Sequence, residues 1–385
     1  MRYCISAISL VGALSLIALH GAAQSFTQTH GGASAQDGVG AMVVGDGYLA
    51  GVRDHDPVEL EHRGQRYALT GGGGLIGTST MDFPNEVFLQ AMGNALDGSA
   101  FLVGSTLTPW ENEHDGIIVK LGGDGNEQWS ATFGGIRSQQ FMCVAALPDG
   151  GAIACGVSTE HGGHDALAVR FSAEGSVLWS AVQESATDVE AHGVAVEGDV
   201  IMITGRQMAF GGTSDLLLWR LDLSGSEIWS TTHGRAANDE GRAIIAQDPN
   251  TFIVAGWTNS FGMIDQSSGR RYTHVYLLAV DLEGDTIWTK AIGDTLYDHR
   301  AYTLAQAPNG DLLLAGERID QASSDALLIR RTATGDAIWD RVIDTGRNDR
   351  LVHLLPLSEA IIGTGRSFGE FGRQLLFIRR SPDGF

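Results

Sequence analysis

One short pattern recurs along this 385-residue chain: an apolar run, a glycine, and a tryptophan four residues after the glycine. Clear copies end at Trp129, Trp179, Trp229, Trp288 and Trp339, at intervals of 50, 50, 59 and 51 residues. Tight-turn signals such as PDGG at 148–151 and PNGD at 308–311 divide each unit into four short apolar runs. Repeats of this length and content are typical of β-propellers, in which neighbouring units bury faces that no unit could bury alone. The sequence therefore predicts an all-β propeller of four-stranded antiparallel blades.

Weaker copies complete the number of blades. FTQTHGG from Phe26 matches WSATFGG from Trp129, with Phe in the Trp position, and YALTGGG from Tyr67 puts Tyr there. The aromatic positions then number seven, which predicts seven blades. The chain ends on QLLFIRRSPDGF, which has the strand and the glycine of the repeat but lacks the Trp. We expect the strand at 26–30 to pair with the strand at 374–380 and close the ring, because closure removes exposed strand edges.

The recurring tryptophans are interpreted as structural anchors that fill the space between neighbouring blades. The strand followed by TGDAIW or SGSEIW resembles the tryptophan-docking hairpin of pyrroloquinoline-quinone-type propellers. The whole unit resembles propeller repeats of exported bacterial proteins. The resemblance implies the fold rather than one activity, because quinone-dependent dehydrogenases and non-catalytic outer-membrane assembly scaffolds share this hairpin. Those quinone-type propellers usually have eight blades, and no quinone or calcium ligand is carried over to a residue here, so the cofactor is unknown.

The first 23 residues predict export. A lone Arg2, an apolar run over 5–19 and the small residues at 21–23 match a signal peptide cleaved near Gln24. Residues 24–385 would then form a single β-propeller domain of seven repeats, secreted or periplasmic. No later apolar run is long enough for a transmembrane helix. The net charge of -21, with 46 acidic against 25 basic residues, disfavours nucleic acid as a partner, since phosphate backbones require a positive surface.

The expected binding site lies on the face that carries the long loops. In a meander of four strands, alternate connections share a face, so the tight turns lie on one face and the loops from Ser105, Arg206, Trp257 and Arg366 on the other. Loops on a rigid scaffold are where ligands usually bind, and we place the site near the axis. The longest departure from the repeat, at 258–272, is the favoured element. Aromatic and arginine side chains of these loops could bind sugars or a protein partner, or could simply pack their own loops; the candidates are Trp110, Phe210, Trp257, Phe261, Arg270, Arg271, Tyr272, Phe368, Phe371 and Arg373.

Other polar groups are given structural interpretations. Asp115, Asp165, Asp215 and Asp325 each open an apolar run, where a carboxylate could accept backbone N–H bonds. The stretch RDHDPVELEH from Arg53 has side chains that could ligate a metal, although a solvated loop explains them as well; they are His55, Asp56, Glu59, Glu61 and His62. Gly72, Gly74 and Gly77 spell GxGxxG, but no helix follows, so a dinucleotide site is not expected.

Two cysteines remain after the predicted signal peptide. Cys143 and Cys155 lie six residues either side of Asp149, at the centre of a predicted hairpin turn. They should face each other across neighbouring strands, where export would permit a disulfide. Buried free thiols are the alternative, because a bridge between adjacent strands is often strained.

Two functional hypotheses follow. The first is a secreted, non-catalytic binding or scaffold propeller with an unknown protein or carbohydrate ligand and no identified catalytic or metal-binding residue. The second is a propeller enzyme, either a quinone-type oxidoreductase or a carbohydrate-active protein, with its site on the long-loop face. An enzyme should concentrate buried acids with shifted pKa values at the axis, whereas a scaffold should show an aromatic and arginine patch to one side.

Overall fold

The computed structural model describes residues 25–31, 35–55, 61–108, 113–266, 268–320, 322–369 and 372–385, and these residues form strands and turns without a helix. The strands of the first three blades are β2 (Ala35–Val44), β3 (Gly47–His55), β4 (His62–Leu69), β5 (Leu75–Thr80), β6 (Val87–Asn94), β7 (Ala100–Thr108), β8 (Glu113–Leu121), β9 (Glu127–Phe133), β10 (Gln139–Ala146), β11 (Ala152–Ser158), β12 (Asp165–Phe171) and β13 (Val177–Gln183). Blades 4, 5 and 6 comprise β14 (Val189–Glu197), β15 (Val200–Met208), β16 (Ser214–Asp222), β17 (Glu227–His233), β18 (Asp239–Asp248), β19 (Thr251–Thr258), β20 (His274–Val280), β21 (Thr286–Ile292), β22 (Asp298–Gln306), β23 (Leu312–Ile319), β24 (Ser324–Arg331) and β25 (Ala337–Ile343). Blade 7 contains β26 (Asn348–Pro356), β27 (Ile361–Gly369), β28 (Gly372–Arg380) and β1 (Phe26–His30).

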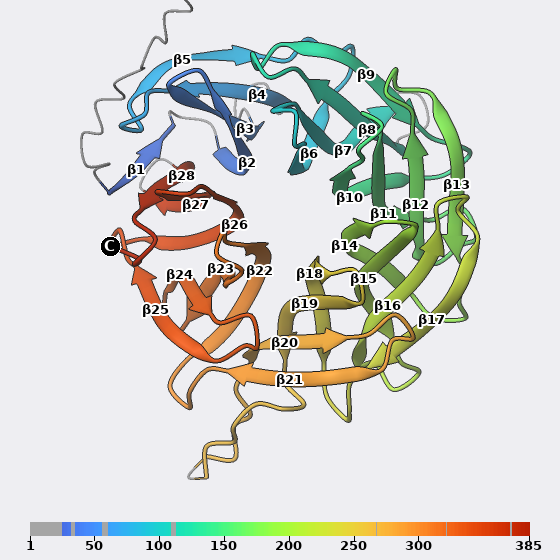
Figure 1. Ribbon diagram of the computed structural model, residues 1–385, viewed down its shortest axis with the longest axis vertical. Coiled ribbons are helices and arrows are strands. Elements are labelled where there is room, and N and C mark those ends of the chain that lie inside the picture. The colour runs from blue at the N-terminus through green and yellow to red at the C-terminus, as the bar shows by residue number, and fades with distance from the viewer. Residues whose placement is uncertain are drawn as a thin grey trace, which may run out of the picture.

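The strands form seven antiparallel four-stranded sheets arranged around one axis, as Figure 1 shows. The innermost strands are β2, β6, β10, β14, β18, β22 and β26, and each sheet then runs outward in chain order, except that β1 is the outermost strand of blade 7. The predicted fold class, a seven-bladed β-propeller, is confirmed.

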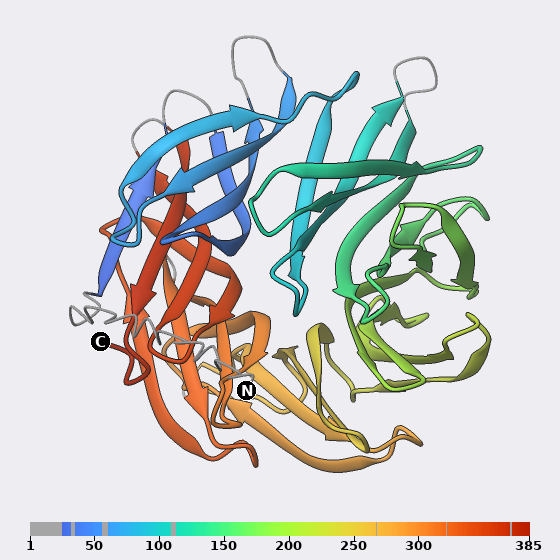
Figure 2. The same ribbon diagram turned by 45° about the horizontal axis from the view of Figure 1, so that its top comes forward.

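The two ends of the chain close the ring within blade 7. β1 pairs with β28 from Phe26 opposite Arg379 to His30 opposite Leu375. In the tilted view of Figure 2, blue β1 lies beside the red strands of this blade. The predicted pairing of the N-terminal and C-terminal strands is confirmed.

The hydrophobic core lies between neighbouring blades. One cluster joins Ile153 and Ala168 of blade 3 to Val189, Ile203 and Leu217 of blade 4. The second and third strands of a blade are covered on both faces, and this is why β11 and β12 read as continuous apolar runs rather than as alternating ones.

One hairpin geometry accounts for the glycine in the repeat. In the turn between β16 and β17, Asp222 N donates to Ser226 O at 3.0 Å, and Gly225 N donates to Asp222 O at 3.0 Å. Gly225 has φ +85°, a conformation that L side chains rarely adopt. This is a turn with a glycine bulge, one of the common ways to join antiparallel strands.

The tryptophan four residues after this glycine docks on the next blade. Trp179 of β13 lies against Gly225 of blade 4, where an added methyl group would come within 2.7 Å of the ring. Its indole Nε1 donates to Leu223 O at 2.9 Å, and Arg170 Nη1 donates to the same oxygen at 2.8 Å. The rings of Trp129, Trp229, Trp288 and Trp339 lie against Gly175, Gly284, Gly335 and Gly384 in the same way. The interpretation of the tryptophans as anchors between blades is confirmed.

The position assigned to Tyr67 is wrong. Tyr67 lies in β4, the third strand of its blade, and is buried in the core. Gly77 of β5 takes the tryptophan position, because it pairs with Ala68 as Trp179 pairs with Arg170. The glycines after Tyr67 form the turn before the outer strand rather than the loop after it. Phe26 does take the tryptophan position, and its ring lies against Gly73 of blade 1.

Candidate functional site in the central cavity

Every innermost strand carries a β-bulge at the same position. In β14 the register shifts between Ala191 and Gly193, which leaves His192 unpaired with the second strand. A bulge re-aims the extra side chain and often lies next to a functional site. The seven bulged residues are Val39, Gln90, Met142, His192, Arg242, Tyr302 and Val352.

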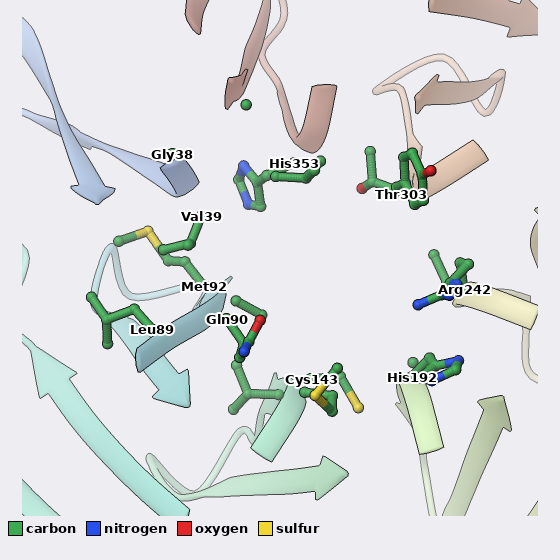
Figure 3. A pocket seen from close by; sticks show the side chains of 18 of the residues that line it. Gly38, Val39, Leu89, Gln90, Met92, Cys143, His192, Arg242, Thr303 and His353 are labelled. Carbon is green, nitrogen blue, oxygen red and sulfur yellow. The ribbon is translucent and has the colours of Figure 1, made fainter. Parts of the chain in front are cut away.

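These bulged residues all line one cavity at the centre of the ring, of about 470 Å³. Figure 3 shows side chains from several blades around its open centre, with Gln90 on one side and His192 and Arg242 on the other. The cavity is lined by all seven innermost strands. Its walls combine apolar side chains such as Leu89 and Met92 with a few polar groups, the composition usual for small-molecule sites.

A histidine between two carboxylates forms one wall of the cavity. His192 Nε2 lies 3.1 Å from Glu190 Oε2, and His192 Nδ1 lies 3.3 Å from Glu240 Oε1. Arg206 holds Glu190 with two bonds of 2.7 and 3.0 Å, and Arg242 forms an ion pair with Glu240. Burial alone would raise the pKa of Glu190, but its bonds to His192, Arg206 and His164 hold that pKa well below its usual value. Glu190 is therefore ionised at neutral pH and is a weak base.

Arginines dominate the opposite wall. Asp37 Oδ2 binds Arg53 at 2.7 Å and Arg373 at 2.8 Å. Arg350 of β26 stands directly opposite Arg366 of β27, and both line the cavity. The pKa of the Arg366 guanidinium is lowered, mainly by burial and secondly by the charge of Arg350.

Two neutral groups lie beside these arginines. The Tyr302 hydroxyl donates to Glu317 Oε1, and burial followed by the charge of Glu317 raises the pKa of Tyr302. Burial lowers the pKa of His353 to about 4, so its imidazole is neutral at physiological pH. Without adding charge, Tyr302 can accept a hydrogen bond at its hydroxyl oxygen, and the neutral His353 imidazole can donate or accept one.

The candidate residues of the 258–272 insertion pack against their own loop and the adjoining strands β20 and β22. Phe261 stacks on Tyr276 with ring centroids 5.3 Å apart, and Tyr272 is buried. Arg270 bonds Asp298 at 2.9 Å and covers Tyr272, while Arg271 donates to Asn259 O at 3.0 Å. The insertion is thus braced by its aromatic and arginine side chains.

The other loop candidates are spread over the same face. Phe210 is 90% exposed in the turn between β15 and β16. Trp257 lies under the guanidinium of Arg300. Phe368 pairs with Arg373 across β27 and β28, close to Arg350 and Arg366. The structure thus brings Phe368 and Arg373 to the arginine wall, but it does not join all the candidates into one patch. Trp110 and Phe371 lie outside the described residues.

The proposed metal loop is described in part. The rings of His55 and His62 stack at 4.2 Å, and Glu61 pairs with Arg63. Burial and the proximity of His55 lower the pKa of His62. Asp56 and Glu59 lie outside the described residues, and within the described ones no group of three or more potential ligands comes together.

Two of the recurring aspartates, Asp165 and Asp325, contact side chains. Asp165 lies 3.1 Å from His161 Nδ1, and Asp325 accepts a bond from Arg318 at 2.6 Å. The backbone N–H just before Asp165, that of His164, is instead capped by Asp188 of the next blade at 3.0 Å. Asp115 also interacts with another group. The pKa of Asp215 is raised, chiefly by burial and secondly by the charge of the nearby Asp239. Gly72, Gly74 and Gly77 lie in the β4–β5 hairpin, without a helix.

The two cysteines lie opposite each other on β10 and β11, as expected, with Cα atoms 5.3 Å apart. The structure has them bonded as a disulfide at the wall of the cavity. GRSFG at 365–369 has the spelling of a serine-hydrolase elbow. Its Ser367, however, is fully buried on β27 beside Thr345 Oγ1 at 3.1 Å, and such a nucleophile needs an exposed turn between a strand and a helix.

Sequence reasoning missed the ring of bulged residues. The signal was present in the innermost strands, where DVEAHG at 188–193 and NDRLVH at 348–353 place charged residues two positions before the bulge. Alignment on tryptophan, however, draws attention to the outer strand. A comparison of the innermost strands would have shown one position that differs in nearly every repeat.

No family model matches the chain, and no curated protein matches it. Among solved structures it is similar to the WD40 domain of Neurospora crassa Pan2, with TM-score 0.50, 8% identity and 90% of each chain covered. An acylaminoacyl peptidase of Pyrococcus horikoshii has TM-score 0.50 and 10% identity over 90% of this chain and 52% of the peptidase, so this chain spans about half of its length. The propeller domain of the Trilobed protease of Pyrococcus furiosus has TM-score 0.49 and 8% identity, with 94% and 98% covered. These similarities concern the fold. No helix in the described part of the chain is long and apolar enough to cross a membrane.

Proposed function

We propose that the protein is a non-catalytic binding propeller whose ligand occupies the central cavity. The observation that carries this proposal is the ring of bulges, which directs a different side chain into one cavity from nearly every blade. A repeat with a purely structural axis has no need of such variety, whereas recognition of an asymmetric ligand does.

The acids beside the cavity favour binding over catalysis. A general acid needs a carboxyl pKa near the working pH, and burial without a cationic partner is the usual way to raise it. Here Glu190 is held ionised by His192, Arg206 and His164, and Asp37 is held by two arginines. The alternative, a quinone-type or carbohydrate-active enzyme on this face, would predict conversion of a bound compound.

The test is a thermal-shift screen of the purified protein with pyrroloquinoline quinone plus calcium, oligosaccharides, carboxylates and phosphates. A ligand at 100 times its Kd should stabilise the fold by about 2.7 kcal/mol. Val39→Trp should abolish the shift by filling the cavity, and because Val39 is itself buried, the variant must keep the far-UV circular dichroism of the wild type. Val43→Trp, on the same strand at a 43% exposed position, is the matched control and should keep it.

Two results would contradict the proposal. A shift that survives Val39→Trp would place the ligand elsewhere, for example on the 258–272 insertion with a protein or carbohydrate partner. Chemical conversion of the bound compound, detected by mass spectrometry, would favour the enzyme hypothesis.

We also propose that the protein is exported and released by cleavage near Gln24. The supporting feature is the apolar run over 5–19 followed by small residues. Expression of the full chain in a bacterium, followed by fractionation and intact mass, tests this proposal. A full-length product in the cytoplasm would contradict it.

A further inference from the structure

Two arginines of blade 7 face each other at the cavity wall. Arg350 and Arg366 are directly opposed across β26 and β27, so their side chains project from the same face of the sheet. Like charges in directly opposed positions destabilise a sheet. Both side chains are only partly exposed, which adds a desolvation cost.

The nearby acids are engaged by other groups. Asp37 binds Arg53 and Arg373, and Glu317 accepts the Tyr302 hydroxyl. Within the described part of the chain, neither Arg350 nor Arg366 has a carboxylate within 4.0 Å, and Arg350 Nε is buried without a hydrogen-bond partner. The Arg350 guanidinium does lie over the Tyr302 ring, 5.1 Å from its centroid.

The charge around the pair contrasts with that of the whole protein. The residues that line the cavity directly include four arginines, Arg53, Arg242, Arg350 and Arg366, and one acidic residue, Asp37. Arg53 is paired with Asp37, and Arg242 with Glu240 behind it, so among these described residues the positive charge without an ion-pair partner is that of Arg350 and Arg366. The chain as a whole has 46 acidic and 25 basic residues. A positive concave site inside a negative protein concentrates an anion there and repels anions elsewhere on the surface.

There is space for a ligand at these two arginines. Besides the central cavity, a smaller one of about 210 Å³ is lined by both of them together with Phe368, Asn348 and Ser324. Two acids also line it, but Glu317 accepts the Tyr302 hydroxyl and Asp349 accepts bonds from Thr345. Phe368 is 53% exposed and offers a flat apolar surface. The planar fork of a guanidinium matches the oxygen pairs of a carboxylate or a phosphate.

We propose that Arg350 and Arg366 form an anion subsite that binds the carboxylate or phosphate group of a small ligand. The rest of this ligand extends into the central cavity, past Tyr302 and His353. The inference rests on the proposed function and names the chemical class of its ligand.

Calorimetric titration at low ionic strength tests the subsite with two pairs of probes. Galacturonate against galactose tests a carboxylate, and glucose 6-phosphate against glucose tests a phosphate. At least one anion of the two pairs should bind, while its neutral counterpart should not. Arg350→Gln or Arg366→Gln should lower the affinity for that anion at least about tenfold, the usual cost of losing a hydrogen bond to a charged group.

Arg137→Gln is the matched control, because Arg137 is exposed on the loop before β10. It removes the same charge from the protein and should leave the affinity unchanged. Inorganic phosphate gives a readout without the organic part of the ligand. It should raise the Tm of the wild type more than that of the Arg350→Gln, Arg366→Gln double variant.

The outcomes separate the two proposals. One result overturns the anion subsite and leaves the cavity as the site. In that result the ligand is neutral, Val39→Trp no longer binds it, and Arg366→Gln binds it with unchanged affinity. Equal binding of anions by the wild type and the double variant also overturns the subsite. Failure of anionic and neutral compounds alike to bind in the cavity overturns both proposals.

Discussion

Contact between the tryptophan of one blade and the glycine of the next should contribute measurably to stability. The perturbation is Gly225→Ala. The new methyl group would lie 2.7 Å from Trp179 Cδ2, closer than such atoms approach, so the ring must move. Gly225 also has φ +85°, where any Cβ adds strain.

Gly212→Ala isolates the contribution of the ring. The turn between β15 and β16 has the same hydrogen bonds, from Ala209 N to Thr213 O at 2.7 Å and from Gly212 N to Ala209 O at 3.0 Å. Gly212 has φ +82°, but its Cβ would meet nothing within 4 Å. This variant therefore carries the backbone strain alone, about 1–2 kcal/mol.

Gly225→Ala adds the cost of displacing Trp179. The ring is half-buried, and its Nε1 bonds Leu223 O at 2.9 Å. Loss of that bond costs about 1 kcal/mol, and partial loss of packing costs about 1–2 kcal/mol more, roughly half of the cost for a fully buried ring. We expect Gly225→Ala to destabilise the fold by about 3–5 kcal/mol in all.

Urea unfolding followed by far-UV circular dichroism measures both variants against the wild type. The midpoint should fall further for Gly225→Ala, with an unchanged slope, since the same surface is exposed on unfolding. Equal losses for the two glycines would refute the argument, because the ring would then contribute nothing beyond the strain of the turn.

Three further changes test other parts of the molecule. Replacing Cys143 and Cys155 together by Ala should cost about 3 kcal/mol, the loop-closure value for a bridge across a short hairpin, and thiol labelling of the urea-unfolded protein without reductant should find both sulfurs unreactive; labelled thiols there would contradict the disulfide. The pKa of His353 is about 4 in the folded protein and near 6.5 when unfolded, so the unfolded chain binds the proton first and stability falls as the pH drops from 6.5 to 4. The loss is at most about 3 kcal/mol, and His353→Gln should reduce it without changing stability at pH 8; an identical pH profile for the variant would show that His353 is not the cause. Phe26→Ala should weaken ring closure by about 2–3 kcal/mol, because the ring packs on Phe377 and Gly73, whereas Phe210→Ala, at a 90% exposed position, should leave stability unchanged; equal Tm values for the two variants would contradict the role of Phe26.

The fold was predictable because its determinants recur. The turn glycine and the docking tryptophan perform the same task in five blades, so their spacing is legible in the sequence. Blade 1 departs from the pattern, with Gly77 in the tryptophan position, and Tyr67 was misplaced for that reason. The seven-blade total nevertheless holds, because the turn and the strands of blade 1 are intact.

The expected binding site on the loop face near the axis stays a prediction, and the cavity lined by the innermost strands was not foreseen from the sequence. Phe368 and Arg373 do lie beside the arginine wall, but Tyr272 is buried and Phe261 stacks on Tyr276 of β20. Sequence cannot tell a loop residue that packs from one that binds, because both need aromatic and arginine side chains. A bulge is likewise invisible in one strand, because it depends on the register with the next.

The bulge ring separates what the fold requires from what a ligand requires. Side chains between blades are confined by two neighbouring sheets, so the repeat keeps them apolar. Bulged side chains such as Gln90 and Tyr302 project into an open cavity, where a change of size or polarity leaves the core untouched. Specificity could therefore change at these positions with little cost to stability. By this argument, Gln90→Met should alter the set of compounds that bind while shifting the urea midpoint little, whereas Leu102→Ala, a fully buried change in the neighbouring strand, should lower stability by about 2–5 kcal/mol.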